Sequence, residues 1–397
     1  MSPFSNAYLR PNQLNQMEPF YPLCVRVCAK CFLVQLEEFE RPEKIFGDYA
    51  YFSSYSESWL RHAREYCERM VDRFQLNGNS LVVEVASNDG YLLQYFQRQG
   101  IRVLGIEPAR NVALAARGKG IPTVEKFFGV QSARELSAAG QQADLIVANN
   151  VLAHVPGLRD FVAGLKLALK PQGTITLEFP HLLRLIEGNQ FDTIYHEHFS
   201  YFSFLTVEEI LREHGLAVSD VEILSTHGGS LRVFARHAEN DSIQPAGFSQ
   251  GVSQCVLQLR EEELAAGIRN LDTYSGFGER VRETKRSLLE LLYALKRTGK
   301  SLVAYGAPAK GNTLLNYCGI GRDFLDYTVD LSPHKQSRFL PGTHLPIYHP
   351  DRIRETRPDY VLVLPWNLRQ EILAQVGYIR EWGGRFVIPV PKAEIVA

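Results

Sequence analysis

The chain has 397 residues, of which 45% are hydrophobic and 22% are charged, and its formal net charge is −1 at pH 7. This length exceeds one ordinary hydrophobic core and predicts two or three globular domains. The near-zero net charge disfavours binding to nucleic acid or to an anionic membrane, and no apolar run is long enough to span a bilayer.

Residues 1–45 are rich in proline and show little periodicity, so we expect a small irregular lobe there. The first residues lack the basic region and apolar core of a signal peptide, which predicts a cytoplasmic protein. The lobe contains Cys24, Cys28 and Cys31, and the Cys-x-x-Cys spacing of the last two is typical of half a zinc site. A closed zinc site needs four ligands, and Cys24 is a possible third. An incomplete zinc site and a metal-free thiol cluster both remain open.

The next part of the chain alternates short apolar segments with amphipathic ones. A first helix is expected over residues 55–76, where apolar side chains recur with a period near 3.6. Strands are predicted at 80–86, 102–106, 143–148 and 174–179, with helices at 91–98, 111–119 and 158–169 between them. This alternation predicts an α/β fold with a parallel, doubly wound sheet.

A second α/β unit follows a charged helical stretch. Two amphipathic helices are expected at 257–268 and 281–295 and should connect the two units. Strands are predicted at 301–305, 327–330, 360–364 and 385–388, the last ending the sheet, and a glycine-bearing turn at 306–313. We therefore divide the chain into the lobe at 1–45, a main α/β domain at 46–240, a helical connector at 241–299 and a smaller α/β domain at 300–397.

The turn after the first predicted strand has the layout of a nucleotide-like cofactor site. Backbone N–H groups at such a turn face the cofactor, and an acid at the end of the next strand, here Glu107, binds ribose hydroxyls. The turn lacks the full G-x-G-x-x-G pattern, which argues against an ordinary NAD site. The candidate cofactor residues are Glu84, Ala86, Asn88, Asp89, Gly90, Glu107, Asn149 and Asn150. The alternative is a plain Asx-Gly turn without a ligand.

The segment Tyr195-His196-Glu197-His198 concentrates groups that move protons near neutral pH. Together with the upstream turn, it indicates an enzyme that deprotonates a substrate beside its cofactor. His154 follows the third strand closely, although a lone histidine there is more typical of a helix start or a core. The competing interpretation is an aromatic-rich segment whose histidines satisfy hydrogen bonds in the core.

Four segments, 46–55, 84–90, 191–198 and 305–313, together resemble the deoxysugar C-methyltransferases, which methylate nucleotide-linked keto-sugars. The resemblance covers nearly the whole chain, and its first and third segments are the most specific. It implies an N-terminal zinc-binding lobe, a class I S-adenosylmethionine (SAM)-dependent methyltransferase domain and a C-terminal Rossmann-like domain that binds the sugar nucleotide. It also implies a monomer.

The resemblance implies a role for each matching residue. His198 matches the base that takes a proton from the carbon beside a keto group, usually C3 of a 4-keto sugar, before the enolate attacks the SAM methyl group. Glu197 and Tyr195 match supporting positions of the family's active site. His154 matches a second histidine, which lies near the keto oxygen of the sugar. Tyr49 matches a tyrosine that the N-terminal region supplies. Cys28 and Cys31 match one cysteine pair of the family's zinc site, whereas the earlier pair is absent from this sequence.

The second glycine turn has small residues that allow close approach of a pyrophosphate, such as that of a TDP-sugar. The candidate substrate residues are Gly306, Lys310, Asn312, Lys335 and Arg338. In the alternative interpretation, the glycines form a turn that packs tightly against its sheet, and the cationic side chains are only solvated. Two other functions stay open: an NAD-dependent sugar-nucleotide oxidoreductase or epimerase, and a non-catalytic protein that binds SAM or a sugar nucleotide.

Overall fold

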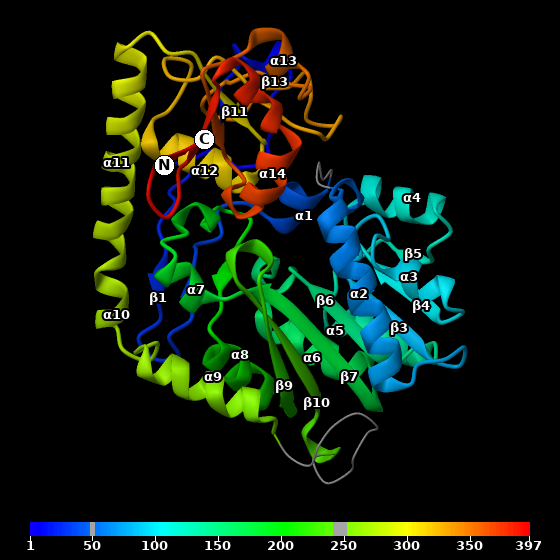
Figure 1. Ribbon diagram of the computed structural model, residues 1–397. Helices are drawn as coiled ribbons and strands as arrows, with labels where there is room; N and C mark the ends of the chain where they lie inside the picture. The colour runs from blue at the N-terminus through cyan, green and yellow to red at the C-terminus, as the bar shows by residue number, and fades with distance from the viewer. Residues whose placement is uncertain (48–51, 241–251) are drawn as a thin grey trace.

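The computed structural model describes residues 1–47, 52–240 and 252–397. It contains a seven-stranded and a six-stranded sheet, each in its own α/β unit, and a small three-stranded sheet. Figure 1 shows the larger unit below and the C-terminal unit above it, with both chain ends at the C-terminal unit. Among the described helices, none combines the length and apolarity needed to cross a membrane.

The seven-stranded sheet has the order β5-β4-β3-β6-β7-β10-β9. Its strands are β3 (Leu81–Val85), β4 (Arg102–Ile106), β5 (Thr123–Val124), β6 (Ala143–Asn149), β7 (Leu169–Pro180), β9 (Leu216–Leu224) and β10 (Ser230–His237). Strand β10 runs antiparallel to both of its neighbours, β7 and β9. The doubly wound fold is confirmed, and the predicted parallel direction holds from β5 to β7 but is wrong for β10, because β9 and β10 form a hairpin rather than a crossover.

Helices cover both faces of this sheet. One layer contains α2 (Glu57–Phe74), α3 (Leu93–Arg98) and α4 (Arg110–Gly118), and the other α5 (Val130–Ala138), α6 (Leu158–Ala168) and α8 (Phe204–Glu213). On β3, Val82 packs into the first layer and Val83 into the second, since successive strand side chains point to opposite faces. The carboxyl ends of the parallel strands consequently form one open edge between the two layers.

The six-stranded sheet has the order β13-β12-β11-β14-β15-β16. Its strands are β11 (Leu302–Tyr305), β12 (Thr328–Val329), β13 (Ile347–Tyr348), β14 (Tyr360–Val363), β15 (Arg385–Ile388) and β16 (Glu394–Val396). Strand β16 pairs antiparallel with β15, so the prediction that 385–388 ends the sheet is wrong. Helix α12 (Ala309–Cys318) takes up most of the predicted glycine turn, which places Lys310 and Asn312 on its first turn.

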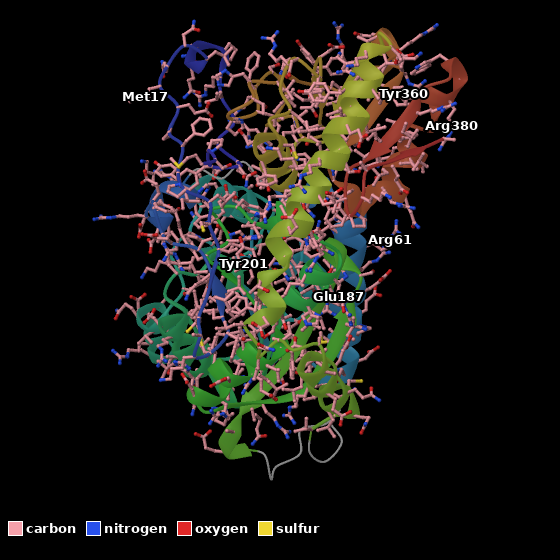
Figure 2. The ribbon with its side chains drawn as sticks, turned by 90° about the vertical axis from the view of Figure 1, so that its left-hand side faces the viewer. Met17, Arg61, Glu187, Tyr201, Tyr360 and Arg380 are labelled. Atoms are coloured by element: carbon pink, nitrogen blue, oxygen red, sulfur yellow. The ribbon has the colours of Figure 1, made fainter. Side chains whose placement is uncertain are left out.

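Helices α9 (Gln254–Ala265), α10 (Asp272–Ser275) and α11 (Phe277–Arg297) connect the two units. Figure 2 shows α11 running lengthwise past both of them. The buried face of α11, including Leu288 and Leu292, packs into the C-terminal core. The remaining helices are α1 (Pro42–Phe46), α7 (Leu182–Glu187), α13 (Arg352–Thr356) and α14 (Arg369–Gln375).

The N-terminal residues contact both α/β units. Strands β1 (Arg26–Val27) and β2 (Val34–Gln35) form the small sheet with β8 (Ser200–Tyr201), which begins two residues after His198. At the other unit, Leu9 forms a β-bridge with Phe339. Figure 2 shows Met17 at the same end of the molecule as Tyr360 of the six-stranded sheet. The N-terminal segment thus joins the region of His198 to the C-terminal unit.

Candidate active site

His198 is held by two hydrogen bonds that define its tautomer. Its Nδ1 lies 3.1 Å from the carbonyl oxygen of Thr193, and its Nε2 lies 2.8 Å from the hydroxyl of Tyr195. Because a carbonyl oxygen only accepts, Nδ1 carries the hydrogen and Nε2 accepts from the tyrosine. Burial, reinforced by the nearby His154, holds the pKa of His198 well below its ordinary value. The imidazole is therefore neutral at neutral pH, and Nε2 is its basic atom.

His154 stands next to this base. It ends the short 3-10 helix η3 (Leu152–His154) after β6, and its ring centroid lies 4.7 Å from that of His198 in an edge-to-face arrangement. Its Nδ1 donates to the backbone carbonyl of Glu197 at 2.7 Å, which leaves a lone pair on Nε2. Burial lowers the pKa of His154 to about 4. In its neutral form His154 presents an acceptor, not a donor, from Nε2.

The carboxylate of Glu197 points to the N-terminal segment. It accepts hydrogen bonds from the backbone N–H of Asn6 at 3.2 Å and from the Asn6 side-chain amide at 2.5 Å. Burial raises the pKa of Glu197 to about 7, although both of these hydrogen bonds oppose the shift. Sequence reasoning missed Asn6, because a partner 191 positions away in an irregular segment carries no local signal.

The predicted cofactor residues gather at the carboxyl ends of β3, β4 and β6. Glu107 accepts hydrogen bonds from the backbone N–H groups of Asn88 at 2.9 Å and Ala109 at 2.8 Å. Burial nevertheless raises the pKa of Glu107 to about 7, and it raises the pKa of Glu84 well above its ordinary value. Gly90 has φ +74°, and a Cβ there would lie 2.8 Å from Ile121. This close approach and conformation require glycine.

Several acceptors at this edge are buried without a hydrogen-bond partner in the described part of the chain. They are Asp89 Oδ1, Asn149 Oδ1, Asn150 Oδ1 and the hydroxyl of Ser87. The backbone of Ala86, Asn88 and Asn150 is also left-handed, with φ values of 57°, 50° and 52°. Buried acceptors that lack partners are costly unless a ligand supplies the missing donors. The edge therefore has the chemistry of a site for a ligand rich in N–H and O–H groups.

Lys310 reaches the same region from the C-terminal unit. Its Nζ donates to Asn367 Oδ1 at 2.9 Å and lies 4.7 Å from the centre of the Trp366 ring. Burial lowers the pKa of Lys310, whereas the charge of Asp192 opposes that shift. The charge of Lys310 also contributes to the lowered pKa of His198. Lys310 is consequently a buried cation near the base rather than a solvated one.

Asp192 is a second buried group that sequence reasoning missed. Its Oδ2 accepts from the Trp366 indole N–H at 2.7 Å. Burial raises the pKa of Asp192 to about 6, although the Lys310 charge opposes the shift. Its signal in the sequence is its place in the same 191–198 segment as His198, only six positions earlier.

The other predicted substrate residues differ in whether their polar groups already have partners within the protein. Lys335 Nζ donates to the Ala307 carbonyl at 2.9 Å and lies 3.4 Å from Asp330, so it is engaged in holding the turn. Arg338 is half-buried, and its side chain has no ion-pair or hydrogen-bond partner among the described residues. Gly306 has φ +89° and packs against Pro365, whereas the side-chain Nδ2 of Asn312 is buried without a partner in the described ranges. Tyr49 lies outside the described residues.

Known proteins match the chain over almost its whole length. The C-methyltransferase NovU of Streptomyces niveus is 36% identical over 380 residues, which cover 96% of this chain and 89% of that protein. Family models match residues 1–46 (a domain named for zinc binding), 59–221 (methyltransferase domain) and 225–391 (C-methyltransferase C-terminal domain). The chain belongs to this C-methyltransferase family.

More distant relatives match shorter parts of the chain. The ubiquinone biosynthesis O-methyltransferase of Methylobacterium sp. (strain 4-46) is 32% identical over 96 residues, 23% of this chain and 37% of that protein. Solved structures include a SAM-dependent methyltransferase from Archaeoglobus fulgidus (16% identity, 44% of this chain and 93% of that one, TM-score 0.35). Another is the magnesium protoporphyrin IX methyltransferase of Synechocystis PCC 6803 with bound SAM. It is 16% identical, the match covers 49% of this chain and 88% of that one, and the TM-score is 0.34.

The enzyme is thus a SAM-dependent C-methyltransferase with a class I methyltransferase fold, as the sequence predicted. The buried acceptors at Asp89, Asn149 and Asn150 fit SAM, which carries an amino group and ribose hydroxyls as donors. The C-methyltransferase assignment decides against the NAD-dependent alternative and against a non-catalytic protein. In the C-terminal unit, the carboxylate of Asp330 follows β12. Both of its oxygens accept hydrogen bonds from the backbone, from the N–H of Ala307 at 2.8 Å and from the N–H of Ser332 at 2.9 Å.

The residues of the N-terminal segment do not fit a zinc ion. The thiols of Cys28 and Cys31 interact with each other, and hydrogen bonding lowers the pKa of Cys28. Cys24 is exposed, and its thiol lies 3.9 Å from the carbonyl of its neighbour Val25. No group of three or more His, Cys, Asp or Glu side chains that could hold a metal occurs within residues 1–47, 52–240 and 252–397. Two thiols fall short of the four ligands of a structural zinc site.

Proposed function

We propose that this C-methyltransferase acts on a nucleotide-linked 4-keto-deoxysugar, a TDP-sugar by resemblance, and methylates it at C3. The observation that carries the proposal is the pair formed by His198 Nε2 and the Tyr195 hydroxyl, 2.8 Å apart and beside the cofactor edge. A ketone oxygen and the acidic hydrogen on the adjacent carbon are separated by a similar distance. A bound substrate would replace the Tyr195–His198 hydrogen bond, so that the hydroxyl donates to the keto oxygen and Nε2 takes the hydrogen of the adjacent carbon; this arrangement suits the formation of an enolate. We further expect the enzyme to act as a cytoplasmic monomer.

In the proposed reaction His198 Nε2 takes the proton from C3, and the electron pair of the C–H bond moves toward the keto oxygen. The developing charge must be stabilised where it forms. The geometry favours Tyr195 for this role, because its hydroxyl is a donor. Neutral His154 offers a lone pair instead, and the carboxylate of Glu197 is directed at Asn6. SAM, held by the residues of the cofactor edge, would supply the electrophilic methyl group for C3 and would leave as S-adenosylhomocysteine.

The sugar nucleotide would lie between the two α/β units, with its diphosphate toward the C-terminal one. Lys310 supplies a buried positive charge near the base, and Arg338 has a guanidinium that the fold leaves free among the described residues. Guanidinium and ammonium groups are the usual partners of phosphate oxygens. Lys335 is engaged with Ala307 and Asp330, so we assign it to holding the turn that faces the diphosphate.

The test uses SAM with a labelled methyl group and a panel of TDP-4-keto-deoxysugars. The expected product carries the label on C3, as located by NMR. In D2O with S-adenosylhomocysteine, the enzyme should also exchange the C3 hydrogen of its substrate without methylating it. Label on another atom would overturn the C3 assignment, and no labelled product from the whole panel would overturn the proposed substrate class.

A further inference from the structure

His227 is a further histidine at the junction of the two units, besides His154 and His198, and its sequence surroundings carry only a weak signal, the two glycines that follow it. It lies in the 3-10 turn η5 (Thr226–Gly228) between β9 and β10, at the open edge of the sheet. Its Nε2 lies 3.5 Å from the side-chain nitrogen of Asn150, a cofactor residue, and its ring packs on Trp59 at 5.2 Å. The turn also packs against η7 (Trp366–Leu368) of the C-terminal unit. His227 therefore lies where the two binding regions meet.

The backbone of this turn is strained. His227 has φ 55°, and it is followed by Gly228 at φ 91° and Gly229 at φ 121°. A non-glycine residue in the left-handed region suffers a steric clash of its Cβ that glycine avoids. Such strain persists where neighbouring contacts enforce it, and it concentrates at functional sites.

Specific hydrogen bonds hold the turn in place. Thr226 Oγ1 donates to Glu178 at 3.2 Å, and the Gln190 side chain donates to the Gly228 carbonyl at 2.7 Å. Glu178 is itself fixed by an ion pair with the buried Arg232 at 2.5 Å. A turn that needed no imidazole could place a third glycine at position 227 and avoid the strain.

The imidazole of His227 is close to the reacting groups. The charge of Lys310 acts on it, and His227 in turn contributes to the lowered pKa of His198. Burial, followed by the Lys310 charge, lowers the pKa of His227 to about 4, so the ring is neutral at neutral pH. Its Nδ1 has no hydrogen-bond partner within the described ranges. A neutral imidazole offers one N–H and one lone pair, which suits a hydroxyl or an amino group.

We propose that His227 contacts the substrate, and that it hydrogen-bonds the hydroxyl or amino group on the carbon that receives the methyl group. This assignment rests on the proposed function. His198 occupies the side from which the proton leaves, and the cofactor edge at Asn150 occupies the side from which the methyl group arrives. The polar substituent of the same carbon must then be fixed by a third group, and His227 is the described histidine beside Asn150. His227 would thereby select substrates by that substituent.

The test compares His227→Gly with the wild type. Glycine removes the imidazole and relieves the strained φ, so the melting temperature should not fall. With a 3-hydroxy or 3-amino substrate, kcat/KM should fall about tenfold to a hundredfold, as expected for a lost hydrogen bond to substrate. With the analogue that has only hydrogen at C3, kcat/KM should change less than about threefold. Added imidazole should restore part of the lost activity on the polar substrate.

His344→Gly is the matched control, because His344 also has a left-handed backbone, at φ 54°, but lies in the C-terminal unit, where its Nε2 is 3.0 Å from Glu18 of the N-terminal segment. It should leave kcat/KM unchanged on both substrates. An equal loss on both substrates for His227→Gly, or no loss on either, would overturn the assignment. A lower melting temperature without imidazole rescue would assign a structural role instead. If the wild type methylates no sugar in the panel, the proposed function itself fails and this inference fails with it.

Discussion

The imidazole of His198 donates from Nδ1 to the carbonyl oxygen of Thr193, 3.1 Å away, and this contact directs the basic Nε2 toward Tyr195. Thr193 ends the short helix η4 (Phe191–Thr193), which also carries the buried Asp192. The backbone of one short segment therefore fixes both the tautomer of the base and its direction. A buried neutral imidazole whose basic nitrogen is engaged only by the Tyr195 hydroxyl can accept a proton without first losing one.

Replacing His198 with Asn removes the basic nitrogen. Turnover should fall about a hundredfold or more, and hydrogen exchange at C3 in D2O should fall with it. The dissociation constant for SAM, measured by calorimetry, should stay within about twofold of the wild-type value. His196→Asn is a control in the same segment, since the His196 ring bonds the Pro22 carbonyl and packs among aromatic side chains. A His198→Asn enzyme with near-normal turnover would remove His198 as the base.

Replacing Tyr195 with Phe removes the proposed donor to the enolate oxygen while leaving the ring packed against His198. We expect kcat to fall about tenfold to a hundredfold with a smaller change in KM, because the missing hydrogen bond strengthens in the transition state. Rapid-mixing measurements of C3 hydrogen exchange should show the same loss. If His154→Phe slowed the exchange and Tyr195→Phe did not, His154 would hold the enolate oxygen instead.

Glu107 makes SAM binding depend on pH. Burial raises its pKa to about 7, so the acid form dominates in the free enzyme below that pH and the carboxylate above it. Ribose hydroxyls and the positive charge of SAM favour the carboxylate, and SAM binding should therefore release a proton below pH 7. The dissociation constant should be about tenfold weaker at pH 6 than at pH 8. Calorimetry on Glu107→Gln should show weaker binding and a flatter pH dependence, whereas an unchanged slope would exclude Glu107.

The sequence predicted best those features that depend on local periodicity. Strand β4 begins and ends where it was predicted, and α2 and α6 lie within two residues of their expected ends. These segments have a clear apolar period and polar or glycine residues at their limits. The candidate residues Asn88 and Glu107 also meet as expected, because adjacent parallel strands bring their carboxyl ends to one edge.

The features that depend on contacts between distant residues could not be predicted in this way. The direction of β10 depends on which strand it pairs with, and its own sequence does not encode that. Asn6 reaches Glu197 across 191 positions, and the Asp192–Trp366 bond spans 174. The left-handed conformation of His227 has a weak local signal in Gly228 and Gly229, but its place beside Asn150 emerges only when the sheet is assembled.

Asn6→Ala should destabilise the enzyme, and more so at high pH. It removes the side-chain donor to the buried carboxylate of Glu197, which should lower the free energy of unfolding by about 1–3 kcal/mol. Because the folded-state pKa of Glu197 is raised to about 7, its contribution favours the fold at low pH and is lost as the pH rises through about 7. In the wild type, the hydrogen bond from the Asn6 side chain to the ionised carboxylate of Glu197 limits this loss of stability, and the variant lacks that bond. The destabilisation should therefore grow by about 1 kcal/mol between pH 6 and pH 8.

Urea unfolding at pH 6 and pH 8 measures this difference. Asn12→Ala, at an exposed position in the same segment, serves as the control and should change stability by less than about 0.5 kcal/mol at either pH. A destabilisation by Asn6→Ala that is equal at both pH values would mean that Glu197 does not ionise over this range.

Lys310→Met tests whether the buried lysine binds substrate. Its ammonium contributes to the lowered pKa of His198 and opposes the raised pKa of Asp192. Methionine keeps much of the side-chain length but removes the charge, so KM for the sugar nucleotide should rise about tenfold or more, while the dissociation constant of SAM stays unchanged. Lys300→Met is the control, because Lys300 pairs with Asp359 on the surface. If KM is unchanged but the melting temperature falls, Lys310 compensates the charge of Asp192 and has no contact with the diphosphate.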